Sequence, residues 1–567
     1  MECLLKRDAS PRVLQADVQV NQCAVIGTSD PGKPRPDRGR VLTRSILSAA
    51  GDPEPKYTLS DIAHVISGEA IGEDLLKDVL SILPALIPSD CDGVDEILKL
   101  VGRCCNGKEL IIGVQECAER LARDDDETKE GSTAASALQM VRMMPMPRVK
   151  TRKRASQTIQ TAVDAMVSAL PVASSSASLS EGRALARTAA ELLDVFQAWV
   201  SVTSHSEPSE TSRCTDILCS FLASVLECSA NRLGTSLSQR LFEGEFSKLV
   251  VESAVRPDWL EGEEAVGTLV YWQRAAAVLG RPPETISSRP SVAPLLLIAH
   301  GPLRENLSLS SFTAIFPAIL TALQTNVALD EALAVLFTVL FPKSPLSDRD
   351  LPPDLIIPLC TVLPSLCSVH PDAPTRHLSF RLLGRLLQLS PSALRLQVLK
   401  ELLAPSEDAF PQMRVSAIGL AKEFIVDSLG RHSKDRKNCP CIFATPIVLQ
   451  AIGPFVFRPD PPDLLSPVPC LNEFVELPES KRLVECLGLY YVLLLRDVDN
   501  KTGIRDPSTV RSIESSLLHP LRNAMQRWSD MGQKMNTDDR HAVLSLAPLE
   551  IGLSRVEEAL KIVRVAA

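Results

Sequence analysis

The feature that most constrains the fold is a helix pair that repeats between residues 373 and 429. The segment Ala-Pro-Thr-Arg376 opens one predicted helix, and Pro-Gln-Met-Arg414 opens another 38 residues later, from 376 to 414. A helix pair with a period of about 40 residues is typical of HEAT and armadillo repeats. Because one pair cannot cover its own apolar face, neighbouring pairs must stack. The repeat therefore predicts an all-α fold, a HEAT/armadillo-like helical-repeat solenoid.

The apolar positions within this repeat indicate which faces are buried. The first helix carries one apolar face made of Leu378, Leu382, Leu383, Leu386 and Leu387. Its opposite face is polar, with Arg381, Arg385 and Gln388. Ser390 followed by Pro391 predicts an N-cap and the first position of the second helix. We expect that helix to bury Leu394, Val398, Leu399, Leu402 and Leu403, and the next helix to bury Val415, Ile418, Phe424 and Ile425.

Composition agrees with a long helical array. Aromatic residues make up only 4% of the 567 residues, which argues against a large sheet, while 45% apolar residues supply a core. Residues 1–56 are rich in Pro, Gly and charge, so we expect a largely disordered N-terminal segment there. Residues 57–285 are expected to form an N-terminal helical-repeat region with polar inserts. Residues 286–567 are expected to form a C-terminal HEAT-like region.

Charge and hydropathy limit the compartments and partners. The net charge of −9 does not suit a nucleic-acid-binding protein, so no direct binding of nucleic acid is expected. The N-terminus lacks a signal-peptide pattern, and the uncharged stretch 306–329 is interpreted as two buried helices and not as a membrane span. The fifteen cysteines form no disulfide framework, which favours reduced thiols. We therefore expect a protein of the cytoplasm, and also of the nucleus, with no membrane association.

One basic cluster has two open interpretations. It comprises Arg148, Lys150, Arg152, Lys153 and Arg154. Such a run is typical of a nuclear import signal, or of a contact with an acidic partner. It is equally typical of a solvated loop between helices that offsets the acidic run at 124–130.

No motif for catalysis or cofactor binding is present. The sequence contains no P-loop, no G-x-S-x-G, no H-E-x-x-H and no G-x-G-x-x-G, so we expect no enzymatic activity and no cofactor. Cys439 and Cys441 flank a single proline, with His432 upstream. They could be a redox pair or half of a metal site, but zinc needs four ligands and this pair has no second pair nearby. A loop with two reduced thiols explains the pair as well.

The C-terminal region has the most distinctive local sequence. The segment 483–495 is apolar nearly all round, which predicts a helix buried between neighbours. The run Arg496-Asp-Val-Asp-Asn500 closes this helix, and Gly503 is expected to adopt a positive φ in the turn that follows. Next comes a helix with Ile513, Leu517 and Leu518. The final amphipathic helix is expected to bury Leu549, Ile551, Leu553, Val556, Leu560 and Ile562.

This order of features resembles the glomulin / aberrant-lateral-root-formation / Yap-binding protein family. The matching elements are the Asp499-Asn500-x-Thr502-Gly503 turn, the Leu517-Leu518-x-Pro520-Leu521 step and the closing Arg555-Val-Glu-Glu558 helix. They lie within residues 483–565, a family-like tail of about 80 residues, and the helical pattern upstream is compatible with the same family. The long polar N-terminus and the low-complexity inserts are similar to the fungal branch.

The resemblance implies a non-enzymatic interaction scaffold. Glomulin-like members bind the RING subunit of cullin-RING ubiquitin ligases and occlude the ubiquitin-conjugating enzyme. The Yap-binding branch is associated instead with the oxidative-stress response through a bZIP transcription factor. If the resemblance holds, the partner is expected to contact the last repeats, with Arg496, Asp497, Asn500 and Lys501 as exposed candidates. The alternative is that the turn is purely architectural, with Asn500, Thr502 and Gly503 stabilising or permitting it.

Overall fold

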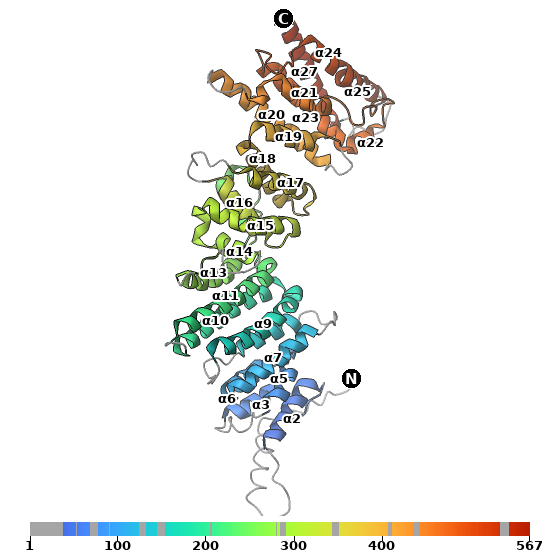
Figure 1. Ribbon diagram of the computed structural model, residues 1–567. Helices are drawn as coiled ribbons and strands as arrows, with labels where there is room; N and C mark the ends of the chain where they lie inside the picture. The colour runs from blue at the N-terminus through green and yellow to red at the C-terminus, as the bar shows by residue number, and fades with distance from the viewer. Residues whose placement is uncertain are drawn as a thin grey trace, which may run out of the picture. The chain divides into compact units, whose positions relative to one another are not determined.

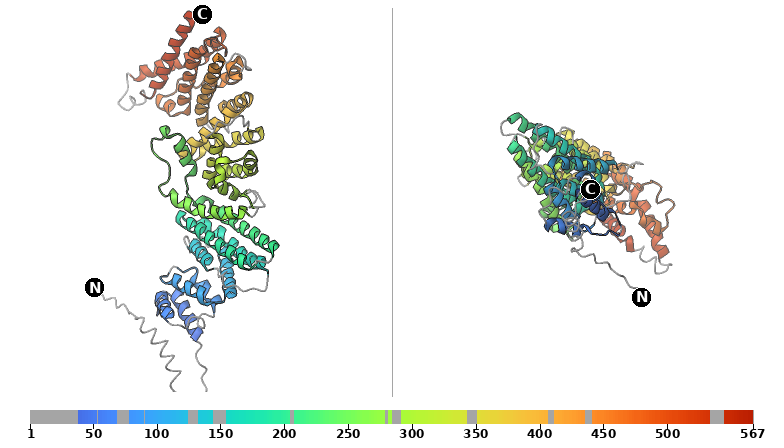
Figure 2. Two further views of the ribbon diagram at one scale, coloured as in Figure 1. Left: turned by 90° about the vertical axis from the view of Figure 1, so that its left-hand side faces the viewer. Right: turned by 90° about the horizontal axis from the view of Figure 1, so that it is seen from below.

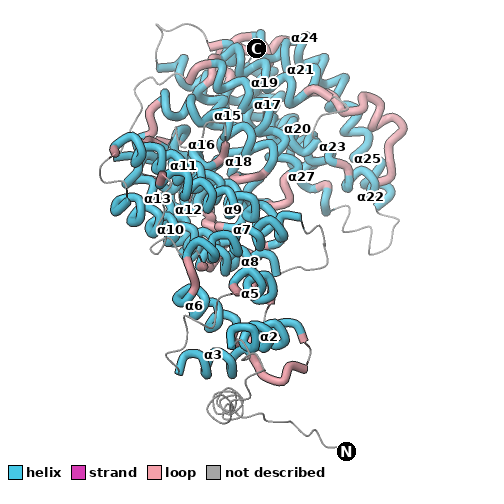
Figure 3. The backbone as a smooth tube through the Cα atoms, turned by 60° about the horizontal axis from the view of Figure 1, so that its bottom comes forward, coloured by secondary structure: helices cyan, strands magenta, loops and turns pink. Residues whose placement is uncertain are grey.

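The chain is described from a computed structural model that covers residues 38–52, 54–68, 78–89, 91–123, 132–143, 154–203, 207–278, 281–283, 291–342, 351–405, 411–434, 441–532 and 544–566. Every regular element in these residues is a helix, and none is a strand (Figure 3). The predicted all-α helical-repeat class is therefore confirmed. None of the described helices combines the length and apolar character that crossing a bilayer requires.

The chain divides into two compact units, residues 1–335 and 336–567. The first unit contains α2 (Arg38–Gly51), α3 (Leu59–Gly68), α5 (Val79–Leu86), α6 (Val94–Cys104), α7 (Gly107–Arg123), α8 (Ser132–Arg142), α9 (Ala155–Ser176), α10 (Leu179–Thr203), α11 (Pro208–Ser229), η2 (Ala230–Arg232), α12 (Leu237–Glu245), η3 (Ser247–Leu249), α13 (Trp259–Val278), α14 (Ala293–His300), η5 (Pro302–Asn306), α15 (Leu309–Thr325) and most of α16 (Leu329–Leu340).

The helices of the first unit form two layers, and Figure 1 shows α5, α7, α9, α10 and α11 following one another along the unit. In one layer α5, α7, α9, α11 and α14 each pack on the next, and in the other α8, α10 and α13 do the same. Chain neighbours such as α8 and α9, or α10 and α11, link the layers. This is the stacking of helical hairpins that a repeat protein needs to bury a continuous core. The further views of Figure 2 show the same succession along this unit.

The second unit contains α17 (Pro353–Val369), α18 (Ala373–Leu389), α19 (Ser392–Leu403), α20 (Pro411–Lys434), η6 (Ile442–Ala444), α21 (Pro446–Val456), α22 (Leu471–Glu476), α23 (Pro478–Arg496), α24 (Pro507–Ile513), η7 (Glu514–Leu518), α25 (His519–Gly532) and α27 (Ala547–Ala566). Helices α17, α20, α23 and α27 pack in succession, and α18, α19, α21 and α22 flank them. Helix α23 is buried between α20 and α27, as its apolar sequence predicted.

The predicted repeat is present, but the predicted N-cap of its second helix is wrong. All five leucines predicted on the buried face of α18 are at most 1% exposed. The N-cap of α18 is Asp372, whose carboxylate accepts a hydrogen bond from Thr375 N at 2.9 Å. Ser390 does not cap α19: its hydroxyl donates to the carbonyl of Leu386 and closes α18 instead. In α19, Leu396 is buried, whereas Leu394 and Leu402 are half-buried.

Three further expectations are wrong in part. Residues 38–51 fall within the segment predicted to lack structure, yet they form α2 with Ile46 fully buried. The uncharged stretch 306–329 holds one helix, α15, and reaches only the first residue of the next. On α27, Ile551 and Ile562 are more than half exposed, because the helix contacts its unit along a narrower stripe than the apolar pattern suggested.

A proline-rich loop in the second unit depends on one buried arginine. Residues 458–470, which contain five prolines, form no helix. The guanidinium of Arg482 on α23 donates to the carbonyls of Phe455 and Val456 at the end of α21, and to the carbonyl of Arg458. It also pairs with the buried Glu479. The charge is compensated by these acceptors, which is the condition for burying an arginine.

Candidate protein-interaction sites

The turn after α23 is organised around a buried carboxylate. Asp497 is only 1% exposed. One carboxylate oxygen accepts a hydrogen bond from Lys501 N at 2.8 Å, and the other accepts from Thr502 N at 2.8 Å and from Thr502 Oγ1 at 2.6 Å. The prediction that Asp497 is exposed is therefore wrong. Its side chain is committed to the turn, because three donors there need an acceptor.

Asn500, Gly503 and Arg505 complete this turn, which we call the C-terminal turn (residues 497–506). Asn500 has a φ of 54° and Gly503 a φ of 78°, as predicted for Gly503. The Asn500 amide donates to Asp506 at 2.7 Å and accepts from Arg505 N at 2.8 Å. The Arg505 guanidinium donates to the carbonyl of Leu494, in the last turn of α23. These contacts are those of an architectural turn.

The exposed surface beside this turn differs from the predicted set. Arg496 is exposed, Lys501 is half-buried, and its ammonium lies 3.3 Å from the carboxylate of Asp499. Two apolar side chains are also exposed: Leu495 at 40% and Val498 at 70%. Sequence reasoning missed both. The exposure of Val498 could have been predicted from its place between two aspartates, because an apolar residue within a polar turn is usually not covered by the core.

Two other predicted sites lie mostly outside the described residues. Of the basic cluster, Arg148, Lys150, Arg152 and Lys153 are outside, and Arg154 is an exposed residue directly before α9. Cys439 is outside as well. The Cys441 thiol is half-buried and accepts a hydrogen bond from the hydroxyl of Ser428 at 3.3 Å.

Most of the described thiols are buried and unreactive. Burial raises the pKa of Cys117, Cys367 and Cys486 to about 12 and that of Cys214, Cys219 and Cys360 to about 11. Since the thiolate is the reactive form, these residues are poor nucleophiles. Among the described residues, Cys91 and Cys470 are the exposed cysteines. The described residues contain no group of three or more His, Cys, Asp or Glu placed to hold a metal ion.

A buried ionic cluster lies in the first unit. The imidazole of His300 is fully buried, with Nδ1 3.3 Å from Glu263 on α13 and Nε2 3.3 Å from Glu331 on α16. Burial alone would lower the pKa of His300, but the hydrogen bonds to both carboxylates raise it to about 9. Burial opposes ionisation of Glu263 too, yet His300 and Arg240 hold its pKa at about 2. Burial raises the pKa of Glu331.

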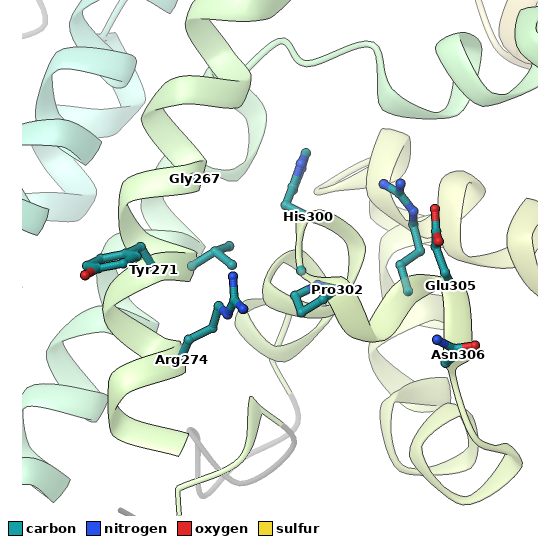
Figure 4. A pocket seen from close by; sticks show the side chains of 10 residues that line it. Gly267, Tyr271, Arg274, His300, Pro302, Glu305 and Asn306 are labelled. Atoms are coloured by element: carbon teal, nitrogen blue, oxygen red, sulfur yellow. The ribbon is translucent and has the colours of Figure 1, made fainter. Parts of the chain in front are cut away.

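Next to this cluster is a groove of about 660 Å³ between α13 and η5, which we call the N-terminal groove. Gly267, Tyr271 and Arg274 form its α13 wall, and Pro302, Arg304 and Glu305 form the η5 wall. Figure 4 shows Arg274 reaching from α13 toward Pro302. Sequence reasoning did not find this groove, because its two walls come from separate helical segments and neither carries a known motif.

Comparison with known proteins assigns the family. A family model described as an uncharacterised protein family, YAP/Alf4/glomulin, matches residues 59–283 and 304–560. Comparison with curated proteins gives no match. The family match includes the C-terminal tail on which the resemblance was based and extends through most of both units. The chain therefore belongs to the YAP/Alf4/glomulin family.

Proposed function

We propose that this protein is a non-enzymatic scaffold that binds the RING subunit of a cullin-RING ubiquitin ligase and occludes the ubiquitin-conjugating enzyme. Family membership is the observation that carries this proposal. The contact is assigned to the second unit, at the surface beside the C-terminal turn. Arg496 and Lys501 remain proposed contact residues. Asp497 and Asn500 are removed from the set, because their side chains are committed to the turn, and Leu495 and Val498 are added as apolar contacts.

The surface beside the C-terminal turn combines exposed side chains with a rigid backbone. Val498 and Leu495 offer apolar contact area, while Arg496, Asp499 and Lys501 supply a charged rim. Interfaces commonly combine a small apolar centre with a polar rim. The hydrogen bonds of Asp497 and Arg505 fix the backbone beneath these side chains, so little conformational entropy is lost on binding. Occlusion requires only a contact of sufficient area, of order 1,000 Å² or more.

The test is binding of the purified full chain to a cullin-associated RING subunit, together with an assay of ubiquitin chain formation. Val498→Asp is expected to weaken binding about tenfold, the equivalent of about 1.4 kcal/mol, and to restore chain formation. The matched control is Val202→Asp on α10, which places the same change at a 78% exposed valine in the first unit and is expected to leave both readouts unchanged. Absence of binding by the unaltered chain at micromolar concentration would refute the proposal.

The alternative is an adaptor in the oxidative-stress response that acts on a bZIP transcription factor. The buried, unreactive thiols favour a passive adaptor over a thiol relay, and the accessible or partly accessible exceptions among the described residues include Cys91, Cys104, Cys441 and Cys470. Replacing Cys439 and Cys441 with serine separates the two modes. A relay through this pair requires that peroxide-dependent activation of the partner be lost, whereas a passive adaptor requires that it persist.

A further inference from the structure

Two arginines, Arg304 and Arg274, line the N-terminal groove. Arg304 donates from Nη1 to the carbonyl of Ala299 at 2.9 Å, which fixes its guanidinium. Its Nε is buried and has no hydrogen-bond partner within the described residues. This Nε is closed off from solvent, so Arg304 contributes to the groove as a positive charge on its wall and not as a bidentate donor. Burial also lowers the pKa of Arg304, as expected for a cation with incomplete compensation.

Arg274 adds a second positive charge from the opposite wall. It is exposed, and no hydrogen bond or ion pair to the described part of the chain engages it. The acidic Glu263 beneath the groove is already paired with His300 and Arg240. Glu305 is the one carboxylate among the lining residues. The lining therefore carries a local positive excess within a chain whose net charge is −9.

Gly267 keeps the α13 wall of the groove open. A Cβ built on Gly267 would meet nothing within 4 Å, so no packing contact requires a glycine there. Glycine in a helix interior costs about 1 kcal/mol relative to alanine. Gly262, one and a half turns earlier, contrasts with it, because a Cβ there would lie 2.2 Å from the carbonyl oxygen of Leu233. Close packing explains Gly262, whereas Gly267 leaves free volume that faces the groove.

The length of the α13 wall of the groove matches a short extended peptide. The wall residues from Gly267 to Arg274 occupy one face of α13 over seven residues, a length of about 10 Å. Three extended residues span about the same distance. Tyr271, which is 74% exposed, also lines the groove, and tyrosine and arginine are the residue types that most often dominate binding at protein interfaces.

We propose that the N-terminal groove docks an extended acidic segment of a partner protein, with its Asp or Glu carboxylates attracted to Arg274 and to the positive charge of Arg304. The partner packs its neighbouring residue over Gly267 and against Tyr271. This site is independent of the surface proposed for the RING subunit, since its residues belong to the first unit. The two sites give the scaffold two separate points of attachment, one in each unit.

The test uses the full chain and two fluorescein-labelled probes, a peptide of alternating Glu and Ala and its counterpart of alternating Lys and Ala. Fluorescence anisotropy is expected to show binding of the Glu peptide alone, weakened by added salt. Arg274→Glu is expected to reduce this affinity about tenfold. Gly267→Gln, which fills the groove without changing charge, is expected to reduce it about fivefold or more.

The matched control is Arg123→Glu on α7, an equal charge change at an exposed arginine outside the groove, and it is expected to leave the affinity within about twofold. A cooperative melting transition in every variant establishes that each is folded. Three results would overturn the proposal: equal binding of the Lys peptide, no binding of the Glu peptide at millimolar concentration, or loss of affinity in Arg274→Glu and Arg123→Glu alike. Full retention of affinity in Gly267→Gln would also overturn it.

Discussion

At the scale of single residues, Asp497 shows how one buried carboxylate determines a turn. It accepts three hydrogen bonds from Lys501 and Thr502, and the backbone reverses between α23 and α24 around it. Asp497→Ala leaves these donors without their acceptor, two of them on the buried Thr502. Unsatisfied buried donors cost about 1–3 kcal/mol each. We expect the variant to lose about 2–4 kcal/mol of unfolding free energy in urea titration of the full chain.

The control for this prediction is Asp499→Ala in the same turn. The side chain of Asp499 is 72% exposed, and its ion pair with Lys501 is a surface contact. Such pairs contribute roughly 0–1 kcal/mol, so the control should be nearly as stable as the unaltered chain. Equal stability of the two variants would show that the Asp497 carboxylate does not hold the turn.

At the scale of helices, α13 carries two glycines with opposite roles. Gly267→Ala adds a methyl group into open space and removes a flexible helix position, so we expect a gain of about 0.5–1 kcal/mol. Gly262→Ala forces a methyl group against the carbonyl of Leu233, which must move, and we expect a loss of more than about 1 kcal/mol. Thermal melting followed by circular dichroism measures both. A gain for both variants would contradict the close contact at Gly262.

Helix α18 shows what could be predicted from the sequence at this scale, and α27 shows what could not. The leucines of α18 recur at helical spacing, and the neighbours on that face cover all five. The same argument applied to α27 assigned Ile551 and Ile562 to the core, but periodicity identifies an apolar face without showing how wide the covering neighbour is. Ser390 was misassigned because a serine before a proline fits either end of a helix.

The candidate sites were less predictable because they depend on contacts between distant segments. Gly503 was foreseen, since an Asn-x-Thr-Gly sequence demands a turn with positive φ. The burial of Asp497 was not foreseen, because an aspartate after a helix is usually solvated. Glu263, His300 and Glu331 lie on three different helices, and no local spacing connects them. Arg304 and Arg274 meet at one groove for the same reason, through the stacking of α13 against the end of α14.

At the scale of the whole molecule, the two units should respond differently to alkaline pH. In the first unit the folded pKa of His300 is about 9, above its usual value of 6.5. Its contribution to stability is therefore complete below pH 6.5 and is lost as the pH rises through 9. A shift of this size corresponds to about 3 kcal/mol. The charged side chains of Arg240, Arg304 and Asp330 surround the cluster. Glu263, whose folded pKa is about 2, acts in the opposite sense and loses its contribution on the acid side, whereas the raised pKa of Glu331 acts in the same sense as that of His300.

We expect urea unfolding of the full chain to separate into two transitions, one for each unit, with the urea midpoint for the first unit falling between pH 6.5 and 8 and the other changing little. The thiols whose folded pKa is raised to about 11 or 12 ionise in the unfolded chain near their usual pKa of 9.0 and then lower the stability of both units, so the test is kept below pH 8. His300→Gln removes the titrating proton and should make the first transition independent of pH in this window, at a lower stability. If the first transition of His300→Gln keeps the alkaline slope of the unaltered chain, the buried imidazole is not its source.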